Sequence, residues 1–451
     1  MGFLPHFPVC SDRTYLGNVS CAISPLGARE STGRDVWAKK VYRSACKFAG
    51  LGRKDMSERD PLKSTDAGTV QLNRMAIDNF KSLVGFTMSL TKFTCLIGLN
   101  GAGKSTILQA MDFLSQQMRG DLAGWLKSRE WKAIDLKSKL SKSSNITFEL
   151  ECDLQGESLV WRGSFNRTLL RCTQESIEID GVLVMKVDDG RFLVERDEEG
   201  DPLTGDIAFE YQGSVLSRLR EESVSGRLLV FKHFIATITS LDALSPQHLR
   251  RKSRETDGGL GFAGEKFSSF LHALPDAHKL KLRELLSGPY PQVQGIDLSA
   301  LRAGWKSLSI LERYADHRFS TEARHMNDGM LRLMAIIAET LSDHQFMLFD
   351  EVENGIHPEV IEFLLDHLVS TPQQVMVTTH SPMVLNYLED DIARGGVQLI
   401  YKTHEGKTRA VSFFNIPAMA EKLTVMGPGE VFVDTNLVAL NQDLVRTNGG
   451  A

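Results

Sequence analysis

A glycine-rich segment with a lysine and a serine gives the sequence its clearest chemical signal. Residues 98–105, GLNGAGKS, match the phosphate-binding pattern G-x-x-x-x-G-K-[ST]. Glycines allow backbone N–H groups to converge on phosphate oxygens without interference from a Cβ atom. We expect Lys104 to reach the β- and γ-phosphates and the Ser105 hydroxyl to bind Mg²⁺. The residues expected to contact ATP are Asn100, Gly101, Ala102, Gly103, Lys104, Ser105 and Thr106.

A second apolar run, residues 345–349, ends in Asp350 and Glu351. In P-loop NTPases the first acid after such a strand holds Mg²⁺, and the second orients or deprotonates the attacking water. We therefore expect Asp350 to bind the metal together with Ser105, and Glu351 to act as the catalytic base. Taken alone, the pattern is also typical of a buried strand that ends in an exposed acidic turn.

A histidine follows the next strand-like run, residues 375–379. Ligands bind at the carboxyl ends of strands in open α/β sheets, so we expect His380 to contact the γ-phosphate or to order the attacking water. The segment between, which begins at Pro358, has helical apolar spacing and would complete a βαβ unit that returns His380 toward Glu351. A histidine at the end of a strand can equally have a purely structural role.

The elements beside the glycine-rich segment are those that a phosphate-binding loop requires. Residues 93–97, FTCLI, are typical of a strand buried on both faces of a parallel sheet. Apolar side chains then recur at helical spacing from Ile107 to Leu114. The loop is therefore expected at a helix N-terminus, where the helix dipole favours anions.

Four motifs, in this order, resemble the ABC-type ATPases of the SMC, RecF and OLD (overcoming lysogenisation defect) group. They are GLNGAGKST, NDGMLR at residues 327–332, LFDEVENGIHP and TTHSP. The resemblance covers about residues 70 to 415 and is closest to the compact branch often encoded in bacterial anti-phage systems. It implies that ATP is the substrate with Mg²⁺, and that a signature motif contacts the γ-phosphate held by a second copy. The residues of the signature motif are Asn327, Asp328 and Gly329, and Asn327 stands where serine is usual.

The resemblance implies a P-loop ATP hydrolase in which two copies clasp two ATP molecules, as a homodimer or within a higher oligomer. ATP-driven dimerisation would regulate a separate effector protein, first of all a nuclease, or the engagement of DNA or RNA in antiviral defence. A RecF-like DNA-repair ATPase and a non-catalytic ATP-sensing scaffold are the alternatives. The long separation between Lys104 and Asp350 argues against a transporter subunit, and too few residues follow His380 for the C-terminal nuclease domain of OLD enzymes.

The bulk composition is that of an ordinary globular protein. The 451 residues are 42% hydrophobic and 24% charged, with a net charge of −5, which does not indicate a strongly basic nucleic-acid binder. No apolar stretch has the length of a membrane span, and the six cysteines include no C-x-x-C pair. His325 and His357 lack partners at metal-ligand spacing. We therefore expect a cytoplasmic protein without membrane contact.

We expect an α/β fold of the P-loop ABC type, in which helices flank a mixed central sheet, with an antiparallel β subdomain and a helical insertion. Five segments are expected along the chain. They are a weakly ordered N-terminal extension (1–69), a P-loop half with the antiparallel subdomain (70–224), a helical insertion (225–325), a half with the signature, acid pair and His380 (326–415), and a C-terminal tail (416–451).

Three further features have two readings each. The basic run at residues 250–254 is either a phosphate-contacting loop or a solvated one. Trp125 and Trp131, with lysines between and after them, either stack on single-stranded nucleic acid or pack a helix onto the core. Gln174 and Gln212 are the candidates for the metal-sensing glutamine that the resemblance implies.

Overall fold

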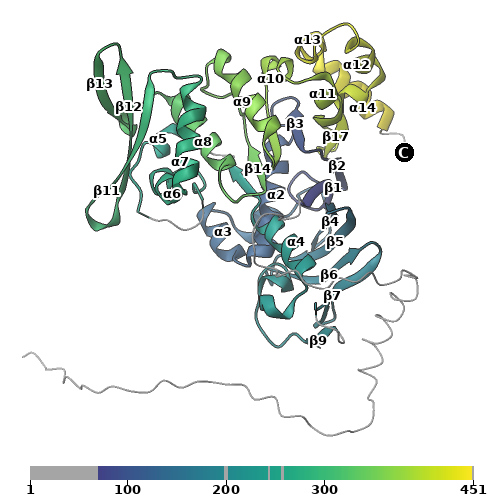
Figure 1. The fold of residues 1–451 in the computed structure, drawn as a ribbon. Helices are drawn as coiled ribbons and strands as arrows, with labels where there is room; N and C mark the ends of the chain where they lie inside the picture. The colour runs from purple at the N-terminus through teal and green to yellow at the C-terminus, as the bar shows by residue number, and fades with distance from the viewer. Residues whose placement is uncertain (1–69, 198–201, 242–243, 255–258, 449–451) are drawn as a thin grey trace, which may run out of the picture.

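The computed structural model describes residues 70–197, 202–241, 244–254 and 259–448, so the expected N-terminal extension lies outside the described residues. Its strands form a central sheet, a larger antiparallel sheet and a small three-stranded sheet (Figure 1). None of the helices in the described ranges has the length and apolar character needed to cross a membrane.

The central sheet is mixed, as expected, with the strand order β10-β14-β15-β3-β16-β17. All neighbouring strands are parallel except β16 and β17. Every residue of β3, β14 and β15 is buried, which explains their continuous apolar runs. The strands are β3 (Phe93–Ile97), β10 (Thr239–Leu241), β14 (Phe346–Phe349), β15 (Gln374–Thr378), β16 (Val397–Lys402) and β17 (Thr408–Ser412).

Two apolar cores lie on opposite faces of this sheet. Along β14, Phe346 and Leu348 belong to one core and Met347 and Phe349 to the other, as the alternation of side chains along a strand requires. The first core contains α2 (Lys104–Arg119) and α4 (Gly226–Ala236). The second contains α8 (Asp328–Thr340), α9 (Pro358–Ser370) and α10 (Pro382–Asn386). The expected βαβ connection through α9 is therefore present.

The antiparallel sheet has the order β2-β1-β4-β5-β6-β7-β8-β9 and packs one face on the first core. Burial alternates along β4, as expected of a strand with one covered face. This sheet is the antiparallel β subdomain expected within residues 70–224. The strands are β1 (Val70–Asp78), β2 (Phe86–Ser89), β4 (Ile146–Leu154), β5 (Glu157–Asn166), β6 (Arg171–Ile179), β7 (Val182–Asp188), β8 (Arg191–Val194) and β9 (Leu203–Asp206).

The segment expected as a helical insertion, residues 225–325, has α-helices only up to Ser287. It contains α4, α5 (Pro246–Leu249), α6 (Phe267–Ala273) and α7 (Asp276–Ser287), with β10 interrupting them. It then forms β11 (Val293–Ala300), β12 (Lys306–Tyr314) and β13 (His317–Glu322), which project from the helices at the left of Figure 1. Leu308 and Ile310, two positions apart, are buried, so a period-two pattern overrides the helical expectation here.

The remaining elements are short. The stretch around Trp125 and Trp131, for which one reading was a helix packed on the core, forms only α3 (Leu122–Ser128) and the 3₁₀ turn η1 (Ala133–Leu136). The expected C-terminal tail folds into helices that partly pack on the second core. They are α12 (Pro417–Lys422), α13 (Pro428–Val433) and α14 (Leu437–Asn448), preceded by α11 (Asp390–Gly396). The other 3₁₀ turns are η2 (Val215–Ser217), η3 (Glu221–Ser223), η4 (Arg302–Gly304), η5 (Ala323–His325) and η6 (Phe413–Asn415).

Candidate active site

The glycine-rich loop connects β3 to α2 and packs against the neighbouring strands without room for side chains. Gly98 has φ +143°, and a Cβ atom there would lie 2.2 Å from the carbonyl oxygen of Ile400 in β16. Gly103 has φ +117°, and its Cβ would lie 2.4 Å from Oγ1 of Thr408. Both positions therefore require glycine for backbone conformation and for space.

Hydroxyl groups beneath the loop hold its backbone in place. Thr408 Oγ1 donates to the carbonyl oxygen of Ala102 at 3.0 Å and lies 2.8 Å from Ser82 Oγ. The Thr408 N–H also donates to the Ser82 carbonyl at 2.9 Å. The turn after β1 and the first residue of β17 thus fix a loop that is far from both in sequence. Such support preorganises the loop's N–H groups.

Lys104 lies across the same loop and is only 6% exposed. Its Nζ donates to the carbonyl oxygens of Gly98 at 2.9 Å and Leu99 at 3.3 Å. Burial lowers the pKa of Lys104, and the nearby acids, first of all Asp350, oppose that shift. The ammonium group is thus fixed by backbone oxygens at the N-terminus of α2.

The acid pair lies at the carboxyl end of β14, beside the loop. Asp350 Oδ2 accepts a hydrogen bond from Ser105 Oγ at 2.8 Å, and Oδ1 accepts one from Thr378 Oγ1 in β15. The Thr378 hydroxyl also accepts from the Glu351 N–H at 2.8 Å. Glu351 adopts φ +47°, which a non-glycine residue rarely does without such support. One buried threonine therefore orients both acids.

Glu353 connects this segment to the histidine loop. Its Oε1 accepts a hydrogen bond from the His380 N–H at 2.9 Å, and its buried Oε2 has no hydrogen-bond partner among the described residues. This contact places the His380 backbone beside the acid pair, since β14 and β15 are parallel neighbours. Glu353 did not stand out in the sequence because only the tertiary contact gives it a role.

The expected residues surround one cavity of about 370 Å³, which we call the P-loop cavity. Ala102 is the only predicted ATP-contacting residue that does not line it; its side chain is buried and belongs to the first core. Ser82 and Lys402 also line the cavity and were not predicted, because neither belongs to a recognisable motif. The lining residues are Ser82, Asn100, Gly101, Gly103, Lys104, Ser105, Thr106, Asp350, Glu351, His380 and Lys402.

The signature segment lies outside this cavity, at the N-terminus of α8. Asn327 caps the helix by accepting a hydrogen bond from the Met330 N–H at 2.8 Å, and Asp328 pairs with Arg250. A Cβ atom on Gly329 would lie 2.7 Å from the carbonyl oxygen of Gly355, so the helix packs closely on the segment after the acid pair. The in-trans role expected for Asn327, Asp328 and Gly329 remains a prediction.

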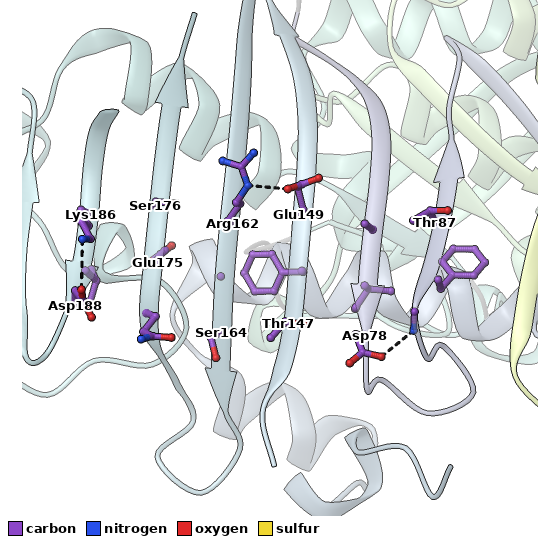
Figure 2. A pocket seen from close by; sticks show the side chains of 18 residues that line it. Asp78, Thr87, Thr147, Glu149, Arg162, Ser164, Glu175, Ser176, Lys186 and Asp188 are labelled. Atoms are coloured by element: carbon purple, nitrogen blue, oxygen red, sulfur yellow. Dashed lines mark hydrogen bonds and ion pairs between the residues drawn. The ribbon is translucent and has the colours of Figure 1, made fainter. Parts of the chain in front are cut away.

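A larger hollow, of about 590 Å³, lies over the antiparallel sheet and contains no residue of the P-loop cavity. Arg162 and Glu149 form an ion pair within it (Figure 2). Gln174 lines this hollow, whereas Gln212 accepts a hydrogen bond from the Ala123 N–H at 2.9 Å. Neither glutamine lines the P-loop cavity, so the structure does not bring either candidate to the predicted metal ligands.

The tryptophans pack in the way that the structural reading predicted. Trp125 is 7% exposed, and its Nε1 donates to Asp112 at 2.7 Å. Its ring meets that of Trp131 edge to face, at 5.6 Å between centroids. His357 caps α9, and the described residues contain no group of three metal-ligating side chains. Trp125, Trp131 and His357 therefore make contacts that support the fold.

Comparison with known proteins identifies a family that this chain matches. Residues 93–386 match the model of the family described as "AAA domain, putative AbiEii toxin, Type IV TA system". The chain belongs to this family. It is a P-loop ATPase of the SMC, RecF and OLD-like kind, as the motifs implied.

The individual proteins that resemble this chain have low sequence identity to it. The OLD nuclease of Thermus scotoductus (strain ATCC 700910 / SA-01) is 27% identical over 132 residues, which are 29% of this chain and 23% of that protein. The "SmcHead bound to the C-winged helix domain of ScpA" is similar in structure at 14% identity and a TM-score of 0.49, over 75% of this chain and 97% of that one. The SMC head domain from Thermotoga maritima has 13% identity and a TM-score of 0.42, over 76% and 98%.

Proposed function

We propose that the P-loop cavity binds Mg-ATP and that its side chains hydrolyse it. The observation that carries the proposal is the hydrogen bond between Ser105 and Asp350, at the edge of a cavity that Lys104, Glu351 and His380 also line. A hydroxyl and a carboxylate oxygen are hard ligands that suit Mg²⁺. Bound there, Mg²⁺ would neutralise charge on the β- and γ-phosphate oxygens.

Each side chain has a separate role in this proposal. Lys104 exchanges its backbone carbonyl partners for phosphate oxygens, while N–H groups of the loop donate to the same phosphates. Glu351 is exposed and accepts a proton from the attacking water. His380 donates a hydrogen bond to the γ-phosphate or to that water. Asp350 is oriented toward the metal position because the hydroxyls of Ser105 and Thr378 both donate to it.

We further propose that a second copy completes the site. Asn327 and Asp328 are exposed at the N-terminus of α8 and do not line the cavity of their own chain. A helix N-terminus favours an anion, which suits the γ-phosphate held by another copy. ATP binding would then favour dimers, and hydrolysis would separate them. In the cell, this cycle would regulate a separate effector, or the engagement of nucleic acid, in antiviral defence; the toxin and nuclease named among the relatives support that reading.

The substitution Glu351→Gln tests the hydrolysis. It should lower the turnover of ATP by roughly 100-fold or more, because it removes the general base, while ATP binding is retained and dimers accumulate. Turnover is measured by phosphate release, and dimers by light scattering with and without ATP. Glu359→Gln, an exposed acid at the start of α9, is the matched control and should hydrolyse ATP at the normal rate.

An unchanged rate in Glu351→Gln would contradict the assignment of the base. If Lys104→Ala also bound and hydrolysed ATP normally, the P-loop cavity would not be the site. Retained binding without turnover in the unaltered protein would instead favour an ATP-sensing scaffold.

A further inference from the structure

The basic run at residues 250–254 and the turn before β12 form one surface. Ser253 and Lys306 are joined by two backbone hydrogen bonds, of 3.3 and 2.8 Å. The turn itself closes through the Leu301 N–H, which donates to the Trp305 carbonyl at 2.7 Å. We call this surface the basic patch; its residues are Arg251, Lys252, Arg254, Arg302, Trp305 and Lys306.

The charge of the basic patch is unusual for this chain. Residues 250–254 and 300–306 together contain six arginines and lysines and no acidic residue, whereas the whole chain has a net charge of −5. Arg251, Lys252 and Arg302 are exposed, and the described part of the chain gives them no ion pair. Burial lowers the pKa of His272, and the charges of Lys306 and Lys279 add to that shift. Such a concentration of positive charge, with three exposed cations that have no ion pair among the described residues, suits a polyanion.

The backbone beneath these cations is fixed. Ser253 is 5% exposed, and its Oγ lies 2.9 Å from Ser269 Oγ in α6. Ser268 Oγ donates to the Arg251 carbonyl at 3.1 Å. Ser253 is buried, whereas Lys252 and Arg254 on either side of it are exposed. The cations are thus presented from a rigid edge, which reduces the ordering that binding requires.

An aromatic side chain lies among the cations. Trp305 is 41% exposed, and the guanidinium of Arg254 lies 5.8 Å from its ring centre. In a duplex the bases are already stacked on each other, whereas unpaired bases stack readily on exposed aromatic rings. The combination of a phosphate-binding edge with an exposed indole therefore favours a single strand over a duplex.

The basic patch is directly connected to the signature segment. Arg250, the residue before the patch, donates from Nη2 to the carbonyl oxygen of Met326 at 2.8 Å and pairs with Asp328. Movement of the 250–254 segment would therefore displace the N-terminus of α8. We propose that the basic patch binds single-stranded nucleic acid and that Arg250 transmits this binding to the signature segment, which changes the rate of ATP hydrolysis. The second part rests on the proposed function, whereas the first does not.

Binding is tested with the full chain and a labelled oligothymidylate of about 30 nucleotides, beside an oligouridylate and a duplex of the same length. Fluorescence anisotropy gives the dissociation constant between about 50 and 200 mM salt. The variant Arg251→Ala/Lys252→Ala should reduce the slope of log K against log salt by about 1.4, since each phosphate contact on a single strand contributes about 0.7. The control Arg313→Ala/Arg318→Ala removes two exposed arginines from β12 and β13 and should leave the slope unchanged.

Trp305→Ala should weaken oligothymidylate binding roughly 5- to 150-fold, and Trp305→Phe should restore most of it. The proposed binding site would be wrong if the two double variants changed the salt slope equally. It would also be wrong if the protein bound duplex and single strand with equal affinity. Preference for oligouridylate or oligothymidylate identifies the single strand as RNA or DNA, and either supports the proposal.

Coupling is tested with Arg250→Gln. This variant should bind the oligonucleotide with nearly normal affinity, but its ATP hydrolysis should no longer respond to the oligonucleotide. A normal response would show that Arg250 does not transmit binding. If the unaltered chain bound the single strand with the expected salt slope but hydrolysed no ATP, the proposed ATP hydrolysis would be contradicted and the proposed binding site would still be supported.

Discussion

Thr378 is the residue on which the geometry of the acid pair depends, and Thr378→Val tests that dependence. The two side chains have nearly the same shape, so the substitution removes the hydroxyl without opening a cavity. In the folded protein this hydroxyl is fully buried; it donates to Asp350 and accepts from the Glu351 N–H at 2.8 Å. The variant therefore leaves a carboxylate oxygen and a backbone N–H without these partners.

The size of the effect follows from these two contacts. A hydrogen bond to a charged group contributes about 1.5–3 kcal/mol, and an unsatisfied, partly buried N–H costs about 1 kcal/mol. We expect the free energy of unfolding to fall by roughly 2–4 kcal/mol, measured by urea denaturation. Because Glu351 keeps φ +47° partly through this contact, turnover of ATP should also fall, by roughly 10- to 100-fold if the carboxylate moves by about 1 Å.

Thr378→Ser keeps the hydroxyl and loses only a methyl group, so it is the matched control. It should retain turnover and lose about 1 kcal/mol of stability. The reasoning would be refuted if the valine variant hydrolysed ATP as fast as the serine variant, because the acids would then be held by other contacts. A loss of stability without a loss of turnover would mean that Thr378 supports the fold but does not position Glu351.

Two further substitutions test the signature segment and the antiparallel sheet. Gly329→Ala should lower stability by about 1–3 kcal/mol and slow hydrolysis, because its Cβ would lie 2.7 Å from the Gly355 carbonyl oxygen. Gly395→Ala should do neither, because its Cβ would lie 3.9 Å from Cγ2 of Thr91, an ordinary contact distance. Burial raises the pKa of Glu175 from 4.5 to about 7, against hydrogen bonds that include one from Trp161. The folded state therefore binds the proton of the Glu175 carboxyl more tightly than the unfolded state does. As the pH rises from about 4.5 through 7, up to about 3 kcal/mol of the free energy of unfolding is lost. Glu175→Gln should flatten this part of the stability profile in urea titrations across that range; an unaltered slope would assign the pH dependence to other groups.

The sequence determined the local elements of the site because their signals are local. Gly98 to Ser105 follow a buried strand and open a helix, and the structure has β3 and α2 there. Asp350 and His380 end apolar runs that proved to be neighbouring parallel strands. A period-two run with few buried positions is a weaker signal, so β11, β12 and β13 were not anticipated within a segment that begins with helices.

Tertiary structure alone decided which distant groups support these motifs. Lys402 and Thr408 approach the loop because the strand order places β16 beside β3 and β17 beside β16, and Ser82 approaches it through its contact with Thr408. Nothing in their local sequence records these contacts. Likewise, the run at residues 250–254 shows its charge in the sequence, but its contact with Trp305 and the link from Arg250 to Asp328 arise only from folding. A motif predicts chemistry because the spacing of its residues along one strand or helix turn determines where their functional atoms lie. Contacts between elements cannot be predicted in this way, because they depend on packing across the whole sheet.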